Sequence, residues 1–192
     1  RGEISNKTKF IAIVGTRKAS AKGVELARSF ARDLVGAGYS IISGLALGID
    51  TATHQGALEA SGITVAVLGN GIDSIYPPQN KDIAEDILTN GAIISEYGPR
   101  EEIEKKNFLE RNRIVSGMAL ATIVIEAPIH SGALVTARLA GEQGRYVFVV
   151  PGSVEDPNYE GSNTLIRDGA ILIRSVEDVL EDIASQSSLF SE

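Results

Sequence analysis

The chain has 192 residues, of which 43% are hydrophobic, and it contains no cysteine. This length suffices for one domain with a sizeable core, and the lack of cysteine excludes disulfides, thiolate zinc sites and thiol nucleophiles. The net charge of −7 does not exclude nucleic acid as a ligand, because the first 150 residues hold equal numbers of basic and acidic residues and the whole excess lies in residues 151–192.

No apolar run in the sequence approaches the ~20 residues of a membrane span. The N-terminus also shows no signal-peptide pattern. We therefore expect a soluble protein of the cytoplasm. Because the chain begins with Arg1 rather than Met, we expect it to be a fragment whose flanking domains are not included.

Strands and helices are predicted to alternate along the chain. Residues 1–9 are mostly polar and are expected to form an N-terminal tail or an added edge element. Strands are predicted at residues 10–14, 39–42, 63–68, 92–95, 121–125, 146–150 and 170–173. Helices are predicted at residues 20–36, 49–60, 81–88, 133–142, 163–168 and 176–183, and one more is expected to begin at or just before Arg111 and Arg113. Residues 185–192 have the composition of a C-terminal tail or linker.

This alternation predicts an α/β fold with a doubly wound, mostly parallel sheet and helices on both of its faces. The loops that follow the strands then converge on the carboxyl edge of the sheet, where doubly wound folds bind ligands. Helix N-termini face the same edge and offer backbone N–H groups to anions. We therefore expect an anionic ligand.

The first strand is followed by Gly15-Thr16-Arg17-Lys18, which combines close backbone approach with a hydroxyl and two cations. A tight turn with solvated basic residues explains the same pattern equally well. The turn lacks the Gly-x-Gly-x-x-Gly fingerprint of dinucleotide sites, and no Walker A sequence occurs in the chain. Enzymes that use nicotinamide cofactors or ATP are thereby disfavoured.

A second basic stretch interleaves an aromatic residue with cations. It contains Lys105, Lys106, Phe108, Arg111 and Arg113. Such a combination suits single-stranded nucleic acid, because cations hold phosphates while a ring stacks on a base. The alternative is a helix with solvated charges, local pairing to nearby glutamates, and a core phenylalanine.

Catalytic and metal-binding patterns are weak. The two histidines, His54 and His130, are too isolated for a metal cluster, and we interpret His54 as a packed helix residue. Asp50, Glu96 and Glu126 end or follow strands near the binding edge, where capping or loop-orienting roles are favoured over acid–base chemistry.

Taken together, the motifs resemble those of the DprA/Smf family of DNA-processing proteins, whose core is an extended Rossmann-like domain. One departure is Leu109-Glu110, where the family usually has a proline after the phenylalanine. The matching motifs follow the family's order over about residues 10–175: Gly15-Thr16-Arg17, Ser43-Gly44-Leu45-Ala46-Leu47-Gly48-Ile49-Asp50, His54, Gly69-Asn70-Gly71, Tyr76-Pro77, Ser95-Glu96, Phe108, Arg111-Asn112-Arg113, Glu126-Ala127, Ser131-Gly132-Ala133-Leu134-Val135-Thr136-Ala137, Pro151-Gly152, Gly161-Ser162-Asn163 and Gly169-Ala170.

The resemblance implies binding of single-stranded DNA, protection of incoming DNA during natural transformation, and loading of the RecA recombinase. It implies a homodimer, no catalysis, no cofactor and no metal. The family's DNA contacts correspond here to Arg17, to Lys105 or Lys106, and to Phe108. Its flanking helical module and C-terminal winged-helix-like module are not in this chain.

We therefore predict a non-enzymatic, single-strand-binding Rossmann-like domain over residues 10–184. Its predicted DNA-binding residues are Gly15, Thr16, Arg17, Lys18, Ser43, Gly44, Lys105, Lys106, Phe108, Arg111, Asn112, Arg113, Ser131 and Gly132.

The alternative function is that of a nucleotide phosphoribohydrolase of the lysine-decarboxylase-like Rossmann group. That group carries Pro-Gly-Gly-x-Gly-Thr-x-x-Glu at the turn where this chain has Ser131-Gly132-Ala133-Leu134-Val135-Thr136, so its catalytic glutamate is not matched. A third interpretation is a sensor of small nucleotides whose output lies in another domain.

Overall fold

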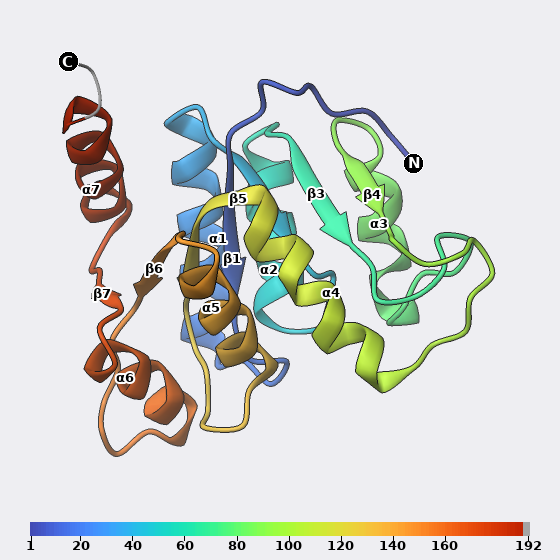
Figure 1. The fold of residues 1–192 in the computed structure, drawn as a ribbon. Coiled ribbons are helices and arrows are strands. Elements are labelled where there is room, and N and C mark those ends of the chain that lie inside the picture. Colours follow the sequence, from blue (N-terminus) through green and yellow to red (C-terminus); the bar gives the residue numbers. More distant parts are fainter. Residues whose placement is uncertain (190–192) are drawn as a thin grey trace.

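A computed structural model describes residues 1–189 and contains one seven-stranded sheet (Figure 1). All its strands are parallel, and their order is β4-β3-β2-β1-β5-β6-β7. The strands are β1 (Phe10–Val14), β2 (Ser40–Ser43), β3 (Thr64–Val67), β4 (Ala92–Ile94), β5 (Ala119–Val124), β6 (Tyr146–Val149) and β7 (Ile171–Leu172). The predicted α/β class and parallel sheet are confirmed.

Seven α-helices and two short 3-10 helices connect the strands within residues 1–189. The helices are α1 (Ala21–Gly36), α2 (Ile49–Glu59), α3 (Lys81–Ile87), α4 (Lys105–Met118), α5 (Gly132–Glu142), α6 (Glu160–Arg167) and α7 (Val176–Leu189), with η1 (Pro78–Asn80) and η2 (Pro157–Tyr159) as the 3-10 turns. In the described residues, no helix is long and apolar enough to cross a membrane.

The sheet is covered on both faces because its central strands are apolar at nearly every position. Every residue of β1 is buried, and alternate side chains enter two different cores. Ile11 and Ile13 pack with residues of α1, α2 and α7, whereas Ala12 and Val14 pack with residues of α4, α5 and α6. In Figure 1, α4 and α5 lie in front of the strands and α1 lies behind them.

The order of the strands reverses between β1 and β5. The chain proceeds outward from β1 through β2, β3 and β4, and then returns through α4 to place β5 on the other side of β1. Such a reversal opens a crevice between the loops that follow the two strands, and doubly wound folds bind ligands there. These loops are residues 15–20 after β1 and residues 125–131 after β5.

Several boundaries differ from the sequence-based prediction. Helix α4 begins at Lys105, so Arg111 lies in its second turn rather than at its start. Its N-cap, Glu104, makes no side-chain hydrogen bond to the helix, and a start without such a cap has no clear sequence signal. Helix α6 begins at Glu160, earlier than predicted.

Both predicted terminal segments contain regular structure. Gly2 forms an antiparallel bridge with Ala92, so the N-terminus runs along the outer edge of β4. Helix α7 continues to Leu189, past the boundary predicted at residue 184. Residues 190–192 of the predicted tail lie outside the described residues.

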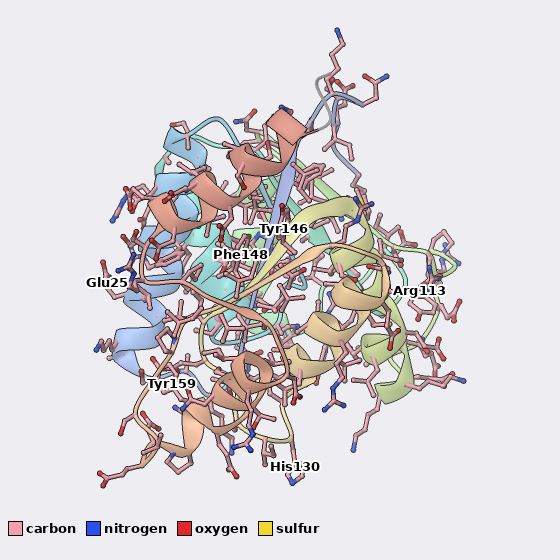
Figure 2. The ribbon with its side chains drawn as sticks, turned by 60° about the vertical axis from the view of Figure 1, so that its left-hand side comes forward. Glu25, Arg113, His130, Tyr146, Phe148 and Tyr159 are labelled. Atoms are coloured by element: carbon pink, nitrogen blue, oxygen red, sulfur yellow. The ribbon has the colours of Figure 1, made fainter. Side chains whose placement is uncertain are left out.

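The packing of Phe148 predicts a large loss of stability on its truncation. Its side chain is fully buried in β6, with its ring stacked on that of Tyr146 at a centroid distance of 5.5 Å (Figure 2). We expect Phe148→Ala to lower the free energy of unfolding by about 3–5 kcal/mol, because it leaves a cavity. The half-exposed Leu172 provides a matched control, for which Leu172→Ala should cost less than about 1 kcal/mol. Urea unfolding followed by circular dichroism measures both values, and equal losses would contradict this description of the core.

Candidate nucleic-acid interface

A cleft of about 480 Å³ opens at the carboxyl edge of the sheet, at the point where the strand order reverses. The loops after β1, β2 and β5 border it together with one face of α4 and the start of α5. Ten of the predicted DNA-binding residues line this cleft: Gly15, Thr16, Arg17, Lys18, Gly44, Phe108, Arg111, Asn112, Ser131 and Gly132.

The turn after β1 presents two cations at the mouth of the cleft. Its path requires glycine at position 15, because a Cβ there would lie 2.8 Å from the carbonyl oxygen of Glu126. The backbone N–H of Thr16 donates to that same oxygen at 2.6 Å, which fixes the turn against the loop after β5. Arg17 and Lys18 are exposed, and neither forms an ion pair within the described residues.

The N-termini of α1 and α5 differ in their charge. At the start of α1, the buried carboxylate of Glu126 accepts hydrogen bonds from the backbone N–H and the hydroxyl of Ser20. At the start of α5, Ser131 caps the backbone N–H of Ala133, and the first turn holds no acidic residue. An anion is attracted to an N-terminus whose positive dipole end is not already neutralised, so α5 offers the better phosphate site.

Arg17 and Phe108 come together from distant parts of the sequence. The guanidinium carbon of Arg17 lies 5.7 Å from the centroid of the Phe108 ring, within cation–π range. The centroid of the Tyr76 ring lies 5.6 Å from that of the Phe108 ring, and the planes of the two rings are tilted by 48°. A Cβ on Gly69 would lie 2.8 Å from Cδ1 of Phe108, so the glycine allows the ring to pack against the loop after β3.

Arg111 is buried beneath the cleft, with only 3% of its surface exposed. Its Nη1 donates to the carbonyl oxygens of Gly44, which follows β2, and of Val67, which ends β3. Burial lowers the pKa of Arg111 to about 10, and the Asp50 carboxylate opposes this shift. Burial likewise raises the pKa of Asp50. Arg111 therefore ties α4 to the strand ends rather than presenting a free charge.

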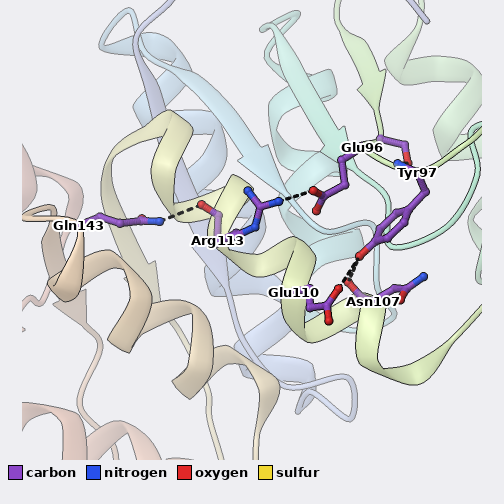
Figure 3. Close-up of polar contacts among 7 residues, drawn as sticks. Glu96, Tyr97, Asn107, Glu110, Arg113 and Gln143 are labelled. Atoms are coloured by element: carbon purple, nitrogen blue, oxygen red, sulfur yellow. Dashed lines mark hydrogen bonds and ion pairs between the residues drawn. The ribbon is translucent and has the colours of Figure 1, made fainter.

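Other predicted contacts lie outside the cleft. Ser43 is fully buried and its hydroxyl donates to the carbonyl of Ile13 at 2.7 Å, because the side chain points into the sheet. Arg113 turns away from the cleft and pairs with Glu96, while Gln143 donates to its carbonyl at 3.0 Å (Figure 3). Lys106 pairs with Glu104 at 2.9 Å.

Lys105 and Asn112 extend the cleft face of α4 in both directions from Phe108. Residues three and four apart lie on one side of a helix, so Lys105, Phe108 and Asn112 share a face. Lys105 is exposed and forms no ion pair in the described part of the chain. The side chain of Asn112 donates to the carbonyl of Gly132 at 3.3 Å, which links α4 to the start of α5.

Asp50, which lines the cleft, and the nearby His54 have structural roles. His54 is fully buried, its Nδ1 lies 2.7 Å from the Thr64 hydroxyl, and burial lowers its pKa to about 3. It is a packed helix residue, as predicted. Among the residues that line the cleft, Asp50 carries the only carboxylate, and it is buried. Within residues 1–189, no group of three or more potential metal ligands is close enough to hold a metal ion.

Three exposed residues that line the cleft are outside the predicted DNA-binding set, namely Leu109, Ile129 and His130. His130 projects from the loop after β5 at the edge of the molecule (Figure 2). Leu109 lies three residues before Asn112 and so on the same side of α4, but that spacing is informative only once the helix is known to include both residues.

Comparisons with known proteins agree with this arrangement. Residues 1–184 match the family described as DNA recombination-mediator protein A. The chain is 43% identical over 174 residues to protein Smf of Escherichia coli (strain K12). This match covers 90% of the chain and 46% of protein Smf. The chain spans about half the length of the first curated relatives that it matches.

Two solved structures share the fold at substantial identity. The X-ray structure of DNA processing protein A from Streptococcus pneumoniae has a TM-score of 0.84 and 41% identity, covering 91% of this chain and 62% of that one. DNA processing protein A from Helicobacter pylori, described as having a unique single-stranded DNA binding mode, has a TM-score of 0.83 and 31% identity, covering 93% and 81%.

The contrast between Arg111 and Arg113 predicts unequal effects on stability. Arg111→Ala leaves two buried carbonyl groups unpaired and removes the cation near Asp50, so it should lower the free energy of unfolding by roughly 2–5 kcal/mol. Arg113→Ala removes an exposed ion pair and should cost less than about 1 kcal/mol. Chemical denaturation of both variants checks this, and a larger loss for Arg113→Ala would contradict the assignment.

Burial of His54 predicts a stability that falls with acid. Unfolded histidine takes up a proton near pH 6.5, whereas folded His54 resists protonation down to about pH 3, so the unfolded state binds more protons between these values. The contribution of His54 to the free energy of unfolding is therefore complete above pH 6.5. It falls by about 1.4 kcal/mol per pH unit as the pH is lowered toward 3. We expect His54→Gln to flatten the dependence of unfolding free energy on pH between 6 and 4. His130→Gln is the matched control on an exposed loop, and an unchanged slope in His54→Gln would refute the prediction.

Proposed function

Since this chain belongs to the DNA recombination-mediator protein A family, we propose that it binds single-stranded DNA, without catalysis, in the cleft at the carboxyl edge of its sheet. The observation that carries this proposal is the pairing of Arg17 with Phe108 beside the open N-terminus of α5. A cation, an aromatic ring and an anion-binding helix end are the parts that hold a phosphate and an unpaired base together.

In this proposal, phosphates contact Arg17, Lys18 and Lys105 and the backbone at Ser131 and Gly132. These cations are exposed and lack acidic partners within the described residues. Arg111 acts indirectly, because its guanidinium is buried and bonded to carbonyl groups. Most of the affinity then comes from the DNA backbone, which makes binding sensitive to salt and nearly independent of sequence.

A base stacks on the surface formed by the Phe108 ring and the Arg17 guanidinium. Base–aromatic stacking is worth about 1–3 kcal/mol, and any base has a face that can stack. Bases inside a duplex have no free face for such a contact. The proposed site therefore favours single strands over duplex DNA.

A purely binding role is supported by the lack of an accessible carboxylate among the residues that line the cleft. Asp50 is buried, Glu126 is bonded to Ser20, and Glu96 pairs with Arg113. A phosphoribohydrolase would need a carboxylate in contact with its nucleotide. Release of free base from a nucleoside monophosphate by this chain would contradict the binding role.

The family supports a broader role as a proposal. A domain that covers single strands, in a family of recombination mediators, suits the protection of incoming DNA during natural transformation and its transfer to RecA in the cytoplasm. We propose RecA and a second copy of this chain as its protein partners. Relatives named DNA processing protein DprA support this role.

Removal of the Arg17 side chain gives a direct test of the cleft. We expect Arg17→Ala to weaken binding of a labelled oligothymidylate by about tenfold, because one phosphate contact and one stacking surface are lost. The slope of log affinity against log salt should fall by about 0.7, the value for one phosphate on a single strand. Fluorescence anisotropy between low and moderate salt measures both quantities, with duplex DNA as the competing ligand.

Arg113→Ala is the matched control, because the Arg113 side chain lies on α4 outside the cleft and pairs with Glu96. The affinity of this variant for the oligothymidylate should stay within about twofold of that of the unmodified chain. If Arg17→Ala leaves affinity and salt slope unchanged while Arg113→Ala reduces both, the DNA lies outside the proposed cleft.

A further inference from the structure

Large apolar side chains are exposed along the cleft beyond the Arg17–Phe108 pair. Leu109 of α4 is 50% exposed, Ile129 of the loop after β5 is 40% exposed, and both line the cleft. Scattered apolar residues on a surface are ordinary, whereas a group of them around one concave site marks a binding surface. These two belong to different elements that border the same cleft, so a ligand entering there meets apolar surface from both.

A second apolar surface borders the same Arg17–Phe108 pair. Leu47 and Tyr76, each 39% exposed, border a smaller hollow of about 60 Å³. Four of the nine large apolar side chains exposed in the described part of the chain therefore gather at one site. The residues that line both the cleft and the smaller hollow are Arg17, Gly44, Ala46 and Phe108.

The charges around the cleft limit what can occupy it. Arg17 and Lys18 are exposed there, the N-terminus of α5 is open, and Asp50 is buried. An occupant must therefore combine apolar, flat groups with negative charge, which excludes basic peptides and neutral hydrocarbons. A single strand has this chemistry, because each phosphate is followed by a base. The cleft volume of about 480 Å³ falls in the range of sites that enclose small organic ligands.

We propose that Leu109 and Ile129 form a second base site, so that a single strand crosses the cleft with neighbouring bases on the two sides of the Arg17–Phe108 pair. The inference rests on the proposed function and assigns binding to two residues outside the predicted set. The first base stacks on the Phe108 ring on the side of Leu47 and Tyr76, and the next lies between α4 and the loop after β5. The intervening phosphate lies at Arg17.

The side chains of the second base site have no hydrogen-bonding groups, so this site binds a base without distinguishing which base it is. Leu109 and Ile129 contact the faces of the base and leave its hydrogen-bonding edges toward solvent. Binding there adds affinity without sequence preference, in keeping with stacking-dominated recognition of single strands. It also adds no charge contact, which separates its contribution from that of Arg17 in a salt titration.

The test combines a protein variant with a change in the DNA. The double variant Leu109→Ala/Ile129→Ala is titrated with a labelled oligothymidylate and with a strand of the same length that lacks its bases. We expect affinity for the oligothymidylate to fall at least about fivefold, with an unchanged salt slope and unchanged affinity for the abasic strand. Leu172→Ala, which removes a 45%-exposed leucine outside the cleft, should leave both affinities unchanged.

The outcomes separate this inference from the proposed function. If the double variant binds oligothymidylate as the unmodified chain does, while Arg17→Ala weakens binding, the second base site is wrong and the function stands. An equal loss on the abasic strand also overturns the inference, because the side chains then act without a base. If the unmodified chain binds no single strand at low salt, both proposals fail. Binding of thymidine monophosphate as tight as that of the oligothymidylate would assign the cleft to one nucleotide instead.

Discussion

The buried guanidinium of Arg111 is the contact on which the cleft depends. It joins the second turn of α4 to the carbonyl groups of Gly44 and Val67, and so fixes that helix across the carboxyl ends of β2 and β3. Gly44 is matched to this contact, because a Cβ there would lie 2.4 Å from Nη2 of Arg111. Phe108 lies one turn earlier on the same helix, so its place beside Arg17 follows from the anchoring of Arg111. The basic residue with the deepest burial therefore shapes the site, while more exposed cations remain free for a ligand.

Charge is distributed at the sheet edge so that only some positive groups remain available. Glu126 occupies the start of α1, Glu96 pairs with Arg113, and Glu104 pairs with Lys106. By contrast, Arg17, Lys18 and the start of α5 have no acidic partner within the described residues. Glu96 and Glu104 thus neutralise the cations on the flanks of the cleft, whereas Arg17 and Lys18 stay available to an anion. A chain of net charge −7 can therefore carry a locally positive surface, since fields between exposed charges decay over about 8–10 Å at moderate salt.

The sequence predicted the α/β class, the parallel sheet and most of its elements, because buried strands and glycine turns leave strong local patterns. It also predicted the turn at Gly15 and placed Phe108 among the residues that line the cleft, while a role of Phe108 in binding stays a prediction. It did not predict the different positions of Arg111 and Arg113, which are two residues apart and so face different sides of a helix. That difference depends on where α4 begins, and its start has no side-chain cap. The sequence did not show that the Ser43 side chain points into the sheet, because the direction of a strand's last side chain depends on register. It also did not show that Leu109 and Ile129 are exposed, because their exposure depends on tertiary packing.

The central claim is that a single strand lies across the Arg17–Phe108 pair. Photocrosslinking of an iodouracil-substituted oligonucleotide, followed by mass spectrometry of the peptides, tests it most directly, because iodouracil reacts with aromatic side chains that it touches. Crosslinks are expected at Phe108 and Tyr76, whose ring centroids lie 5.6 Å apart, and they should be lost in excess unlabelled single strand. Crosslinks confined to Tyr146 on β6 or to Tyr39 before β2, with none at the cleft, would contradict the claim.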